Sequence, residues 1–130
     1  MIRSAAPTDL PLIAAIQAAS PEASQWKPED YLGYSCCLAD DAAFIVTREV
    51  APGEFEILNL AVTPSARRQG HAKALLAHVL RASGTWFLEV RASNSAALRL
   101  YESTGFLPIG SRQNYYGGSQ ESAIVMRYQK

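Results

Sequence analysis

The sequence predicts one α/β (α+β) domain over residues 1–130, built on a mixed and mostly antiparallel sheet of about seven strands flanked by about four helices. Three observations support this prediction. A chain of 130 residues suits one domain. Apolar residues make up 48% of it and charged residues 18%, as in globular proteins. The apolar periodicity also alternates between strand and helix spacing in the order β-α-α-β-β-β-α-β-α-β-β.

The first half reads as a short strand, two helices and an antiparallel meander. Thr8 is a favourable N-cap for a helix that reaches about residue 19, and Pro28 begins a short second helix that ends near Gly33. Turn residues at 40–41 and 51–53 separate the three strands that follow. The strands of this half are expected at residues 2–5, 35–39, 42–49 and 54–62.

In the second half, strands alternate with helices. A basic loop at residues 65–70 precedes a helix over 72–81 and an apolar strand over 86–91. The run Ser93-Asn94-Ser95 caps a further helix, and Gly105 ends it because glycine readily takes the left-handed conformation at a helix C-terminus. Two last strands are expected at residues 107–112 and 122–128.

Charge excludes some functions and suggests another. Twelve basic and twelve acidic side chains give a formal net charge of zero, which argues against a general nucleic-acid or membrane-surface binder. Residues 1–65 nevertheless carry three basic and nine acidic side chains, whereas residues 66–130 carry nine basic and three acidic. This uneven distribution of charge suggests that the two halves bind groups of opposite charge, for instance an anion on one half and a cation on the other. Chance and surface solubility are the alternative.

The sequence gives little support for a membrane-spanning helix, a disulfide or a metal site. No stretch approaches the ~18–20 apolar residues of a membrane-spanning helix, and a cytoplasmic protein that keeps its N-terminus is expected. Cys36 and Cys37 are adjacent, so a disulfide between them would be strained. His71 and His78 share a helix face without further ligands nearby, so no metal site is expected.

The loop after the third meander strand has the pattern of a phosphate-binding turn. The strand passes through Thr63-Pro64 into Arg-Arg-Gln-Gly-His-Ala at residues 67–72, which opens an amphipathic helix. Unpaired N–H groups at a helix N-terminus bind phosphate oxygens. Gly70 permits close approach, Ala72 keeps the turn small, and Lys73 adds charge together with the two arginines. The pattern is neither a Walker loop nor Gly-x-Gly-x-x-Gly. A tight turn with solvated arginines is the alternative.

Here the sequence resembles the GNAT superfamily of acetyl-CoA-dependent N-acetyltransferases. The family signature is Arg/Gln-x-x-Gly-x-Gly/Ala, and Arg67, Gly70 and Ala72 match it. A second block over residues 88–106, Leu-Glu-Val-Arg-Ala-Ser-Asn-Ser-Ala-Ala through Leu-Tyr-Glu-Ser-Thr-Gly-Phe, is similar to the RimI branch of ribosomal-protein-alanine N-acetyltransferases. The run Arg-Gln-Asn-Tyr-Tyr at 112–116 strengthens that similarity. The element order also matches the GNAT fold.

The resemblance implies acetyl-CoA as cofactor, coenzyme A as product and no metal. The pantetheine arm would pair with the backbone of residues 60–62, where an amide would also hold the acetyl oxygen. The pyrophosphate would lie on the amides of residues 68–73. Asn94 would bond the pantetheine arm, and Ala97 and Tyr101 share its helix face at i+3 and i+7. The implied cofactor-binding residues are Leu60, Ala61, Val62, Arg68, Gln69, Gly70, His71, Ala72, Lys73, Asn94, Ala97 and Tyr101.

Two proton-transfer groups are implied by the same resemblance. Glu89, from the Leu-Glu-Val-Arg-Ala block, would be the general base, and Tyr101 would be the acid that protonates the coenzyme A thiolate. Glu89 lies inside an apolar strand, where an unpaired charge is costly, so an ion pair with Arg91 is the structural alternative. Glu56, early in the third meander strand, is a rival base, and either glutamate could act through a water.

The implied substrate is a protein N-terminus, the N-terminal alanine of a small-subunit ribosomal protein, acetylated by direct transfer in a ternary complex. Trp26, Tyr115 and Tyr116 would form the walls that hold it. No nucleic-acid or membrane partner is expected, and the protein would be a monomer or weak dimer. Two alternatives stay open: a GNAT enzyme that acts on a small-molecule amine, and a non-catalytic acyl-CoA-binding module.

Overall fold

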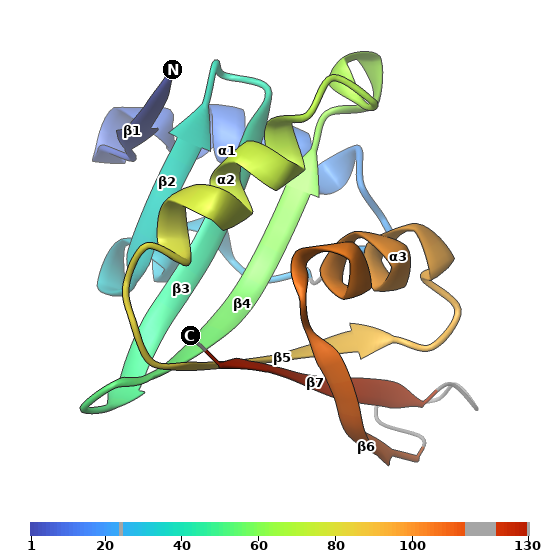
Figure 1. The fold of residues 1–130 in the computed structure, drawn as a ribbon. Coiled ribbons are helices and arrows are strands. Elements are labelled where there is room, and N and C mark those ends of the chain that lie inside the picture. Colours follow the sequence, from blue (N-terminus) through green and yellow to red (C-terminus); the bar gives the residue numbers. More distant parts are fainter. Residues whose placement is uncertain (24, 114–121, 130) are drawn as a thin grey trace. The chain divides into compact units, whose positions relative to one another are not determined.

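A computed structural model describes residues 1–23, 25–113 and 122–129, and it confirms the predicted fold class (Figure 1). Seven strands are hydrogen-bonded in the order β1-β2-β3-β4-β5-β7-β6. The helical elements are η1 (Pro7–Asp9), α1 (Leu10–Ala18), η2 (Pro28–Gly33), η3 (Pro64–Ala66), α2 (His71–Val79) and α3 (Ser95–Thr104). The strands are β1 (Ile2–Ser4), β2 (Ser35–Ala39), β3 (Ala43–Ala51), β4 (Glu54–Val62), β5 (Thr85–Arg91), β6 (Leu107–Arg112) and β7 (Ala123–Gln129).

The chain forms two compact units. Unit 1 comprises Met1–Arg48 and Ile57–Ala82, and unit 2 comprises Glu49–Glu56 and Ser83–Lys130. Strands β3 and β4 run from unit 1 into unit 2, so the end of their hairpin belongs to unit 2. The expected phosphate loop lies in unit 1, and both expected proton-transfer residues lie in unit 2. The organisation of residues 1–130 as one functional domain stays a prediction.

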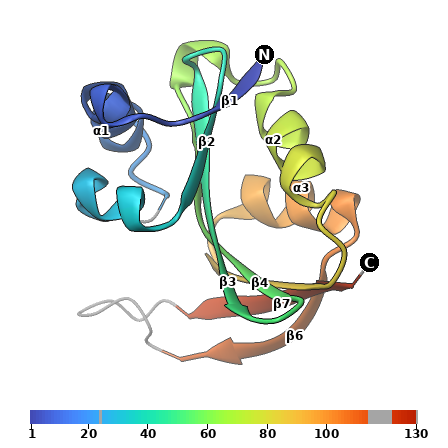
Figure 2. The same cartoon turned by 90° about the vertical axis from the view of Figure 1, so that its left-hand side faces the viewer.

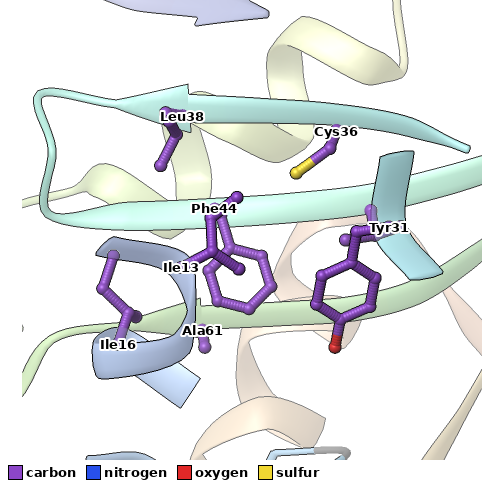
Figure 3. Close-up of a cluster of buried hydrophobic side chains, with 8 residues drawn as sticks. Ile13, Ile16, Tyr31, Cys36, Leu38, Phe44 and Ala61 are labelled. Carbon is purple, nitrogen blue, oxygen red and sulfur yellow. The ribbon is translucent and has the colours of Figure 1, made fainter. Parts of the chain in front are cut away.

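Unit 1 is a layered structure around strands β1 to β4. Strands β1, β2 and β3 are antiparallel neighbours, with Leu38 opposite Phe44. Helices α1 and η2 cover one side of these strands and α2 covers the other (Figure 2). Figure 3 shows the core on the α1 side, where side chains from α1, η2, β2, β3 and β4 meet. Its buried members are Ile13, Ile16, Tyr31, Cys36, Leu38, Phe44, Val46 and Ala61.

Unit 2 is built on the antiparallel strands β5, β7 and β6. Trp86, Leu88 and Val90 alternate with less buried residues along β5, as expected of a strand with one face in a core. The Trp86 ring stacks on Phe55 at the end of the β3–β4 hairpin, with ring centroids 4.5 Å apart. Gly84 is required beside it, because a Cβ there would lie 2.3 Å from the Gly53 carbonyl oxygen.

Two local predictions are wrong in their detail. Thr8 is not an N-cap, because the chain first forms the 3-10 turn η1 and Asp9 is the residue before α1. The Asp9 carboxylate accepts the Ala6 N–H at 2.8 Å and two Arg3 guanidinium bonds at 2.8 Å, which outweighs the local preference of threonine. The expected second helix lies at Pro28–Gly33 but is a 3-10 helix. None of the helices in the described ranges is long and apolar enough to cross a membrane.

Candidate active site

The last part of β4 is the expected pantetheine-binding segment, and side chains hold both of its ends. At its start, the Leu60 N–H donates to Asn59 Oδ1 at 3.0 Å. At its end, the Val62 carbonyl accepts from Ser20 Oγ at 3.3 Å and from Arg67 Nε at 3.3 Å. Ala61, between them, is buried in the unit 1 core. The Leu60 amide therefore already has a side-chain acceptor.

The backbone of the expected phosphate loop is left-handed at two positions, of which one is a glycine. Arg68 and Gly70 both have positive φ, +66° and +84°, and Gly70 is the residue from which α2 starts. A glycine is favoured at the second position because a side chain would be strained there, even though a Cβ would meet nothing within 4 Å. Helix α2 therefore begins with amides at residues 71–73 that have no intrahelical acceptor, beside open space that a phosphate could fill.

Arg67 differs from the expectation that it adds charge for a phosphate. Its guanidinium forms an ion pair with Glu22 at 2.7 Å and also bonds Ser20 Oγ at 3.3 Å. Arg67 therefore anchors the loop to the end of α1 and to β4. Arg68 in the loop and Lys73 in the first turn of α2 are also exposed, and the Gln69 side chain bonds the Ser65 carbonyl at 3.5 Å.

Trp26 belongs to unit 1 and is about one-third exposed, at 36%. Its ring lies 6.3 Å from the rings of Tyr31 and Tyr34, centroid to centroid. Its carbonyl accepts a hydrogen bond from Gln17 Nε2 at 2.5 Å. The other two expected substrate residues, Tyr115 and Tyr116, lie outside the described residues.

Glu89 lies on β5 opposite Val125 of β7, with its side chain 23% exposed. Its Oε1 pairs with Arg112 Nε of β6 at 3.3 Å. The ion pair expected as an alternative therefore forms, but with a residue from another strand and not with Arg91. Its Oε2 is buried and makes no hydrogen bond to any part of the chain that the structure describes. A carboxylate with one oxygen anchored and the other unpaired is oriented and can still accept a proton.

Helix α3 presents the other three expected residues of unit 2. Asn94 is its N-cap, and Asn94 Oδ1 accepts the Ala97 N–H at 3.2 Å, which leaves the amide NH₂ as a donor for a ligand. Tyr101 is 7% exposed, and its ring meets Phe106 edge-on at 5.6 Å. Burial raises the pKa of the Tyr101 phenol well above its ordinary value of 10.0, so the hydroxyl stays protonated and can donate.

The rival base Glu56 is half-buried on the unit 2 part of β4 and interacts with other groups of the chain. Sequence analysis missed one feature: the side chains of Gln17, Tyr31 and Asn59 bond one another, and Asn59 also bonds the Leu60 amide of the expected pantetheine segment. The signal that could have found it is the asparagine between Leu58 and Leu60, a polar residue in an apolar strand.

The residues present fit acetyl-CoA. In unit 1 the positive-φ loop and the N-terminus of α2 suit a pyrophosphate, and in unit 2 Asn94 offers a side-chain donor. Among the described residues no cluster of three or more His, Cys, Asp or Glu side chains could hold a metal ion.

Proteins of similar sequence include two N-acetyltransferases of the kind that the sequence resembles. The chain is 46% identical over 92 residues to the ribosomal protein bS18-alanine N-acetyltransferase of Escherichia coli K12, an alignment covering 65% of this chain and 62% of that protein. It is 40% identical over 78 residues to the N-alpha-acetyltransferase RimI of Mycobacterium tuberculosis, covering 58% of this chain and 49% of that protein. The alignments thus span less than two thirds of these relatives' length.

Solved structures agree with the fold. The ribosomal-protein-S18-alanine N-acetyltransferase from Escherichia coli matches with a TM-score of 0.80 and 35% identity, covering 98% of this chain and 91% of that one. Naa20 from Chaetomium thermophilum matches with a TM-score of 0.88 at 22% identity, covering 99% and 86%, and this likeness concerns the fold alone. A model of the acetyltransferase (GNAT) family matches residues 11–106. The RimI-like resemblance is confirmed, and the chain belongs to the acetyltransferase (GNAT) family.

Proposed function

We propose that this protein transfers the acetyl group of acetyl-CoA to the N-terminal α-amine of a protein, by direct transfer in a ternary complex. The acceptor is the N-terminal alanine of a small-subunit ribosomal protein, met in the cytoplasm. The observation that carries the proposal is the likeness, at 35% identity over 98% of the chain, to a structure whose name states that activity. Residues 1–130 act as one acetyltransferase domain, as a monomer or weak dimer.

Unit 1 supplies the cofactor-binding groups. The amides of the loop and first turn of α2, residues 68–73, bind the pyrophosphate, and Arg68 and Lys73 add charge. Residues 60–62 of β4 pair with the pantetheine arm, and Ser20 and Asn59 hold the two ends of that segment in place. When bound, acetyl-CoA supplies an activated thioester carbonyl and a thiolate leaving group. Asn94 of unit 2 donates to the arm, and Ala97 leaves room beside it.

Unit 2 supplies the proton-transfer groups. Glu89 accepts the proton that the α-amine loses, directly or through a water, and Arg112 holds the carboxylate in place. An α-amine needs only a modest base, because its pKa is about 8. Tyr101 donates a proton to the departing thiolate, because burial keeps the phenol protonated. Glu56 remains the rival base.

The proposal is tested with a panel of acceptors and radiolabelled acetyl-CoA. Peptides that begin with Ala are compared with the same peptides carrying a blocked N-terminus, with Lys-containing blocked peptides, and with polyamines and free amino acids. Transfer to the free Ala-initiated peptides alone supports the proposal. Transfer only to small amines would assign the protein to small-molecule acetylation, and tight acetyl-CoA binding without turnover would make it a non-catalytic binding module.

A further inference from the structure

Three buried polar side chains of unit 1 form a hydrogen-bonded network that the proposed chemistry does not yet use. Gln17 of α1 and Asn59 of β4 are each 5% exposed, and Tyr31 of η2 is completely buried. The Tyr31 hydroxyl donates to Gln17 Oε1. Asn59 Nδ2 donates to the Tyr31 hydroxyl at 2.8 Å and to Gln17 Oε1 at 3.3 Å. Three elements far apart in the sequence are thereby joined inside an otherwise apolar core.

The network ends at two places that the proposed function needs. On one side, Asn59 Oδ1 accepts the Leu60 N–H at 3.0 Å, at the start of the pantetheine segment. On the other side, Gln17 Nε2 donates to the Trp26 carbonyl at 2.5 Å, in the loop assigned to the acceptor peptide. Every polar atom of the Gln17 and Asn59 amides therefore has a partner in the network or at one of its ends.

A core that served stability alone would not need this arrangement. Burying polar groups costs free energy unless each is hydrogen-bonded, and apolar side chains of the same shape would fill the space at no such cost. A fully satisfied network instead restricts its members to one geometry. Burial also raises the pKa of Tyr31 to about 12, so the hydroxyl remains a donor across the physiological range.

We infer that Gln17, Tyr31 and Asn59 are positioning residues that set the β4 segment and the Trp26 loop in one fixed relation, and so align the acetyl donor with the acceptor amine. None of the three is assigned contact with a reacting atom. Tyr31 is the central residue of the network, because its hydroxyl bonds both amide side chains. This inference rests on the proposed acetyl transfer, since the two ends of the network matter together only if both substrates bind there.

The test compares variants that cut the network with one that spares it. Tyr31→Phe removes the hydroxyl and keeps the ring, and Gln17→Met keeps the length of the side chain without its polar atoms. Gln17→Glu keeps the acceptor oxygens that Tyr31 and Asn59 use. Ile16→Val removes one methylene group from the same helix and the same core, and serves as the control for a general loss of stability.

Two measurements are made on each variant well below its unfolding temperature. Steady-state kinetics separate kcat from KM for acetyl-CoA and for the Ala-initiated peptide. Hydrogen exchange of the Leu60 amide, followed by NMR in the protein alone, reports the β4 end of the network without any turnover.

Tyr31→Phe and Gln17→Met are expected to lower kcat at least about tenfold, because they remove two and three of the buried hydrogen bonds on which the alignment rests. Their KM for acetyl-CoA should stay within about twofold, because the phosphate loop is untouched, and Leu60 exchange should be about fivefold faster. Gln17→Glu keeps the bonds to Tyr31 and Asn59 but loses the donor to the Trp26 carbonyl, so it should keep the slow Leu60 exchange and share the loss of kcat. Unchanged kcat and exchange in Tyr31→Phe, or equal losses in Ile16→Val, would overturn the inference. Absence of transfer by the unmodified protein would instead refute the proposed function, and Leu60 exchange would still report on the network.

Discussion

Glu89 is the residue whose replacement tests the proposed chemistry most directly. Glu89→Gln keeps the side-chain shape and an oxygen for Arg112, and removes the ability to accept a proton. With a pKa of about 8, roughly one tenth of an α-amine is neutral at pH 7, and roughly nine tenths at pH 9. A variant without the base reacts only through that neutral fraction. Its kcat/KM at pH 7 should therefore fall at least about tenfold, and up to about 10²–10⁴-fold if Glu89 also takes the proton in the transition state.

The same variant should remain folded. The pair between Glu89 and Arg112 is 3.3 Å long, and the two side chains are 23% and 56% exposed. An ion pair this accessible contributes no more than about 1 kcal/mol, because solvent screens it. Urea unfolding of Glu89→Gln should therefore give a free energy of unfolding within about 1 kcal/mol of the unmodified protein.

The assay is initial-rate transfer to an Ala-initiated peptide between pH 6 and pH 9, with Glu56→Gln as the matched control. Activity of Glu89→Gln should rise about tenfold from pH 7 to pH 9, because the neutral fraction of the amine rises by that factor. Glu56→Gln should keep the pH profile of the unmodified protein. Full activity of Glu89→Gln at pH 7, or a loss confined to Glu56→Gln, would refute the assignment of the base.

Three further predictions concern the loop, a crowded glycine and an acid-sensitive contact. Gly70→Ala places a side chain at φ +84° and should lose about 1 kcal/mol of stability in thermal melts. In titration calorimetry it should also bind acetyl-CoA more weakly than Gly70→Asn, because asparagine tolerates this conformation better. Gly84→Ala, whose Cβ would lie 2.3 Å from a backbone oxygen, should lose at least about 2 kcal/mol in urea unfolding, whereas Gly110→Ala, with open space, should lose less than about 1. Hydrogen bonds from Arg3 lower the pKa of Asp9 from 3.8 to about 2. The stability that this ionised carboxylate adds above pH 3.8 should therefore be lost as the pH falls through 2. Acid unfolding should show this loss in the unmodified protein and not in Asp9→Asn.

The local parts of the fold follow from sequence, because short-range steric and hydrogen-bonding preferences decide them. Strands β2, β4 and β6 begin and end at the predicted residues. Asn94 and Gly105 delimit α3 as expected, since an asparagine side chain caps a helix start and glycine accepts the positive φ at its end. Gly70, which was expected only to permit close approach of a ligand, also has the left-handed conformation.

The partners of the charged side chains could not be predicted, because chain neighbours are not neighbours in space. Arg67 pairs with Glu22, 45 positions away, and so anchors its loop. Glu89 pairs with Arg112 on β6, although Arg91 is two residues away on its own strand. Neither partner can be chosen without knowing which strands and loops lie together.

Sequence alone thus yields the candidates that reside in single residues and short motifs: the expected cofactor loop, the proposed base Glu89 and the proposed acid Tyr101. Packing decides how those groups are held, since burial and long-range hydrogen bonds exist only once the elements have docked. The network of Gln17, Tyr31 and Asn59 shows the difference most clearly. Asn59 alone stands out in its own segment, as a polar residue in an apolar strand. Only the docking of α1, η2 and β4 brings the three buried polar side chains together so that they satisfy one another.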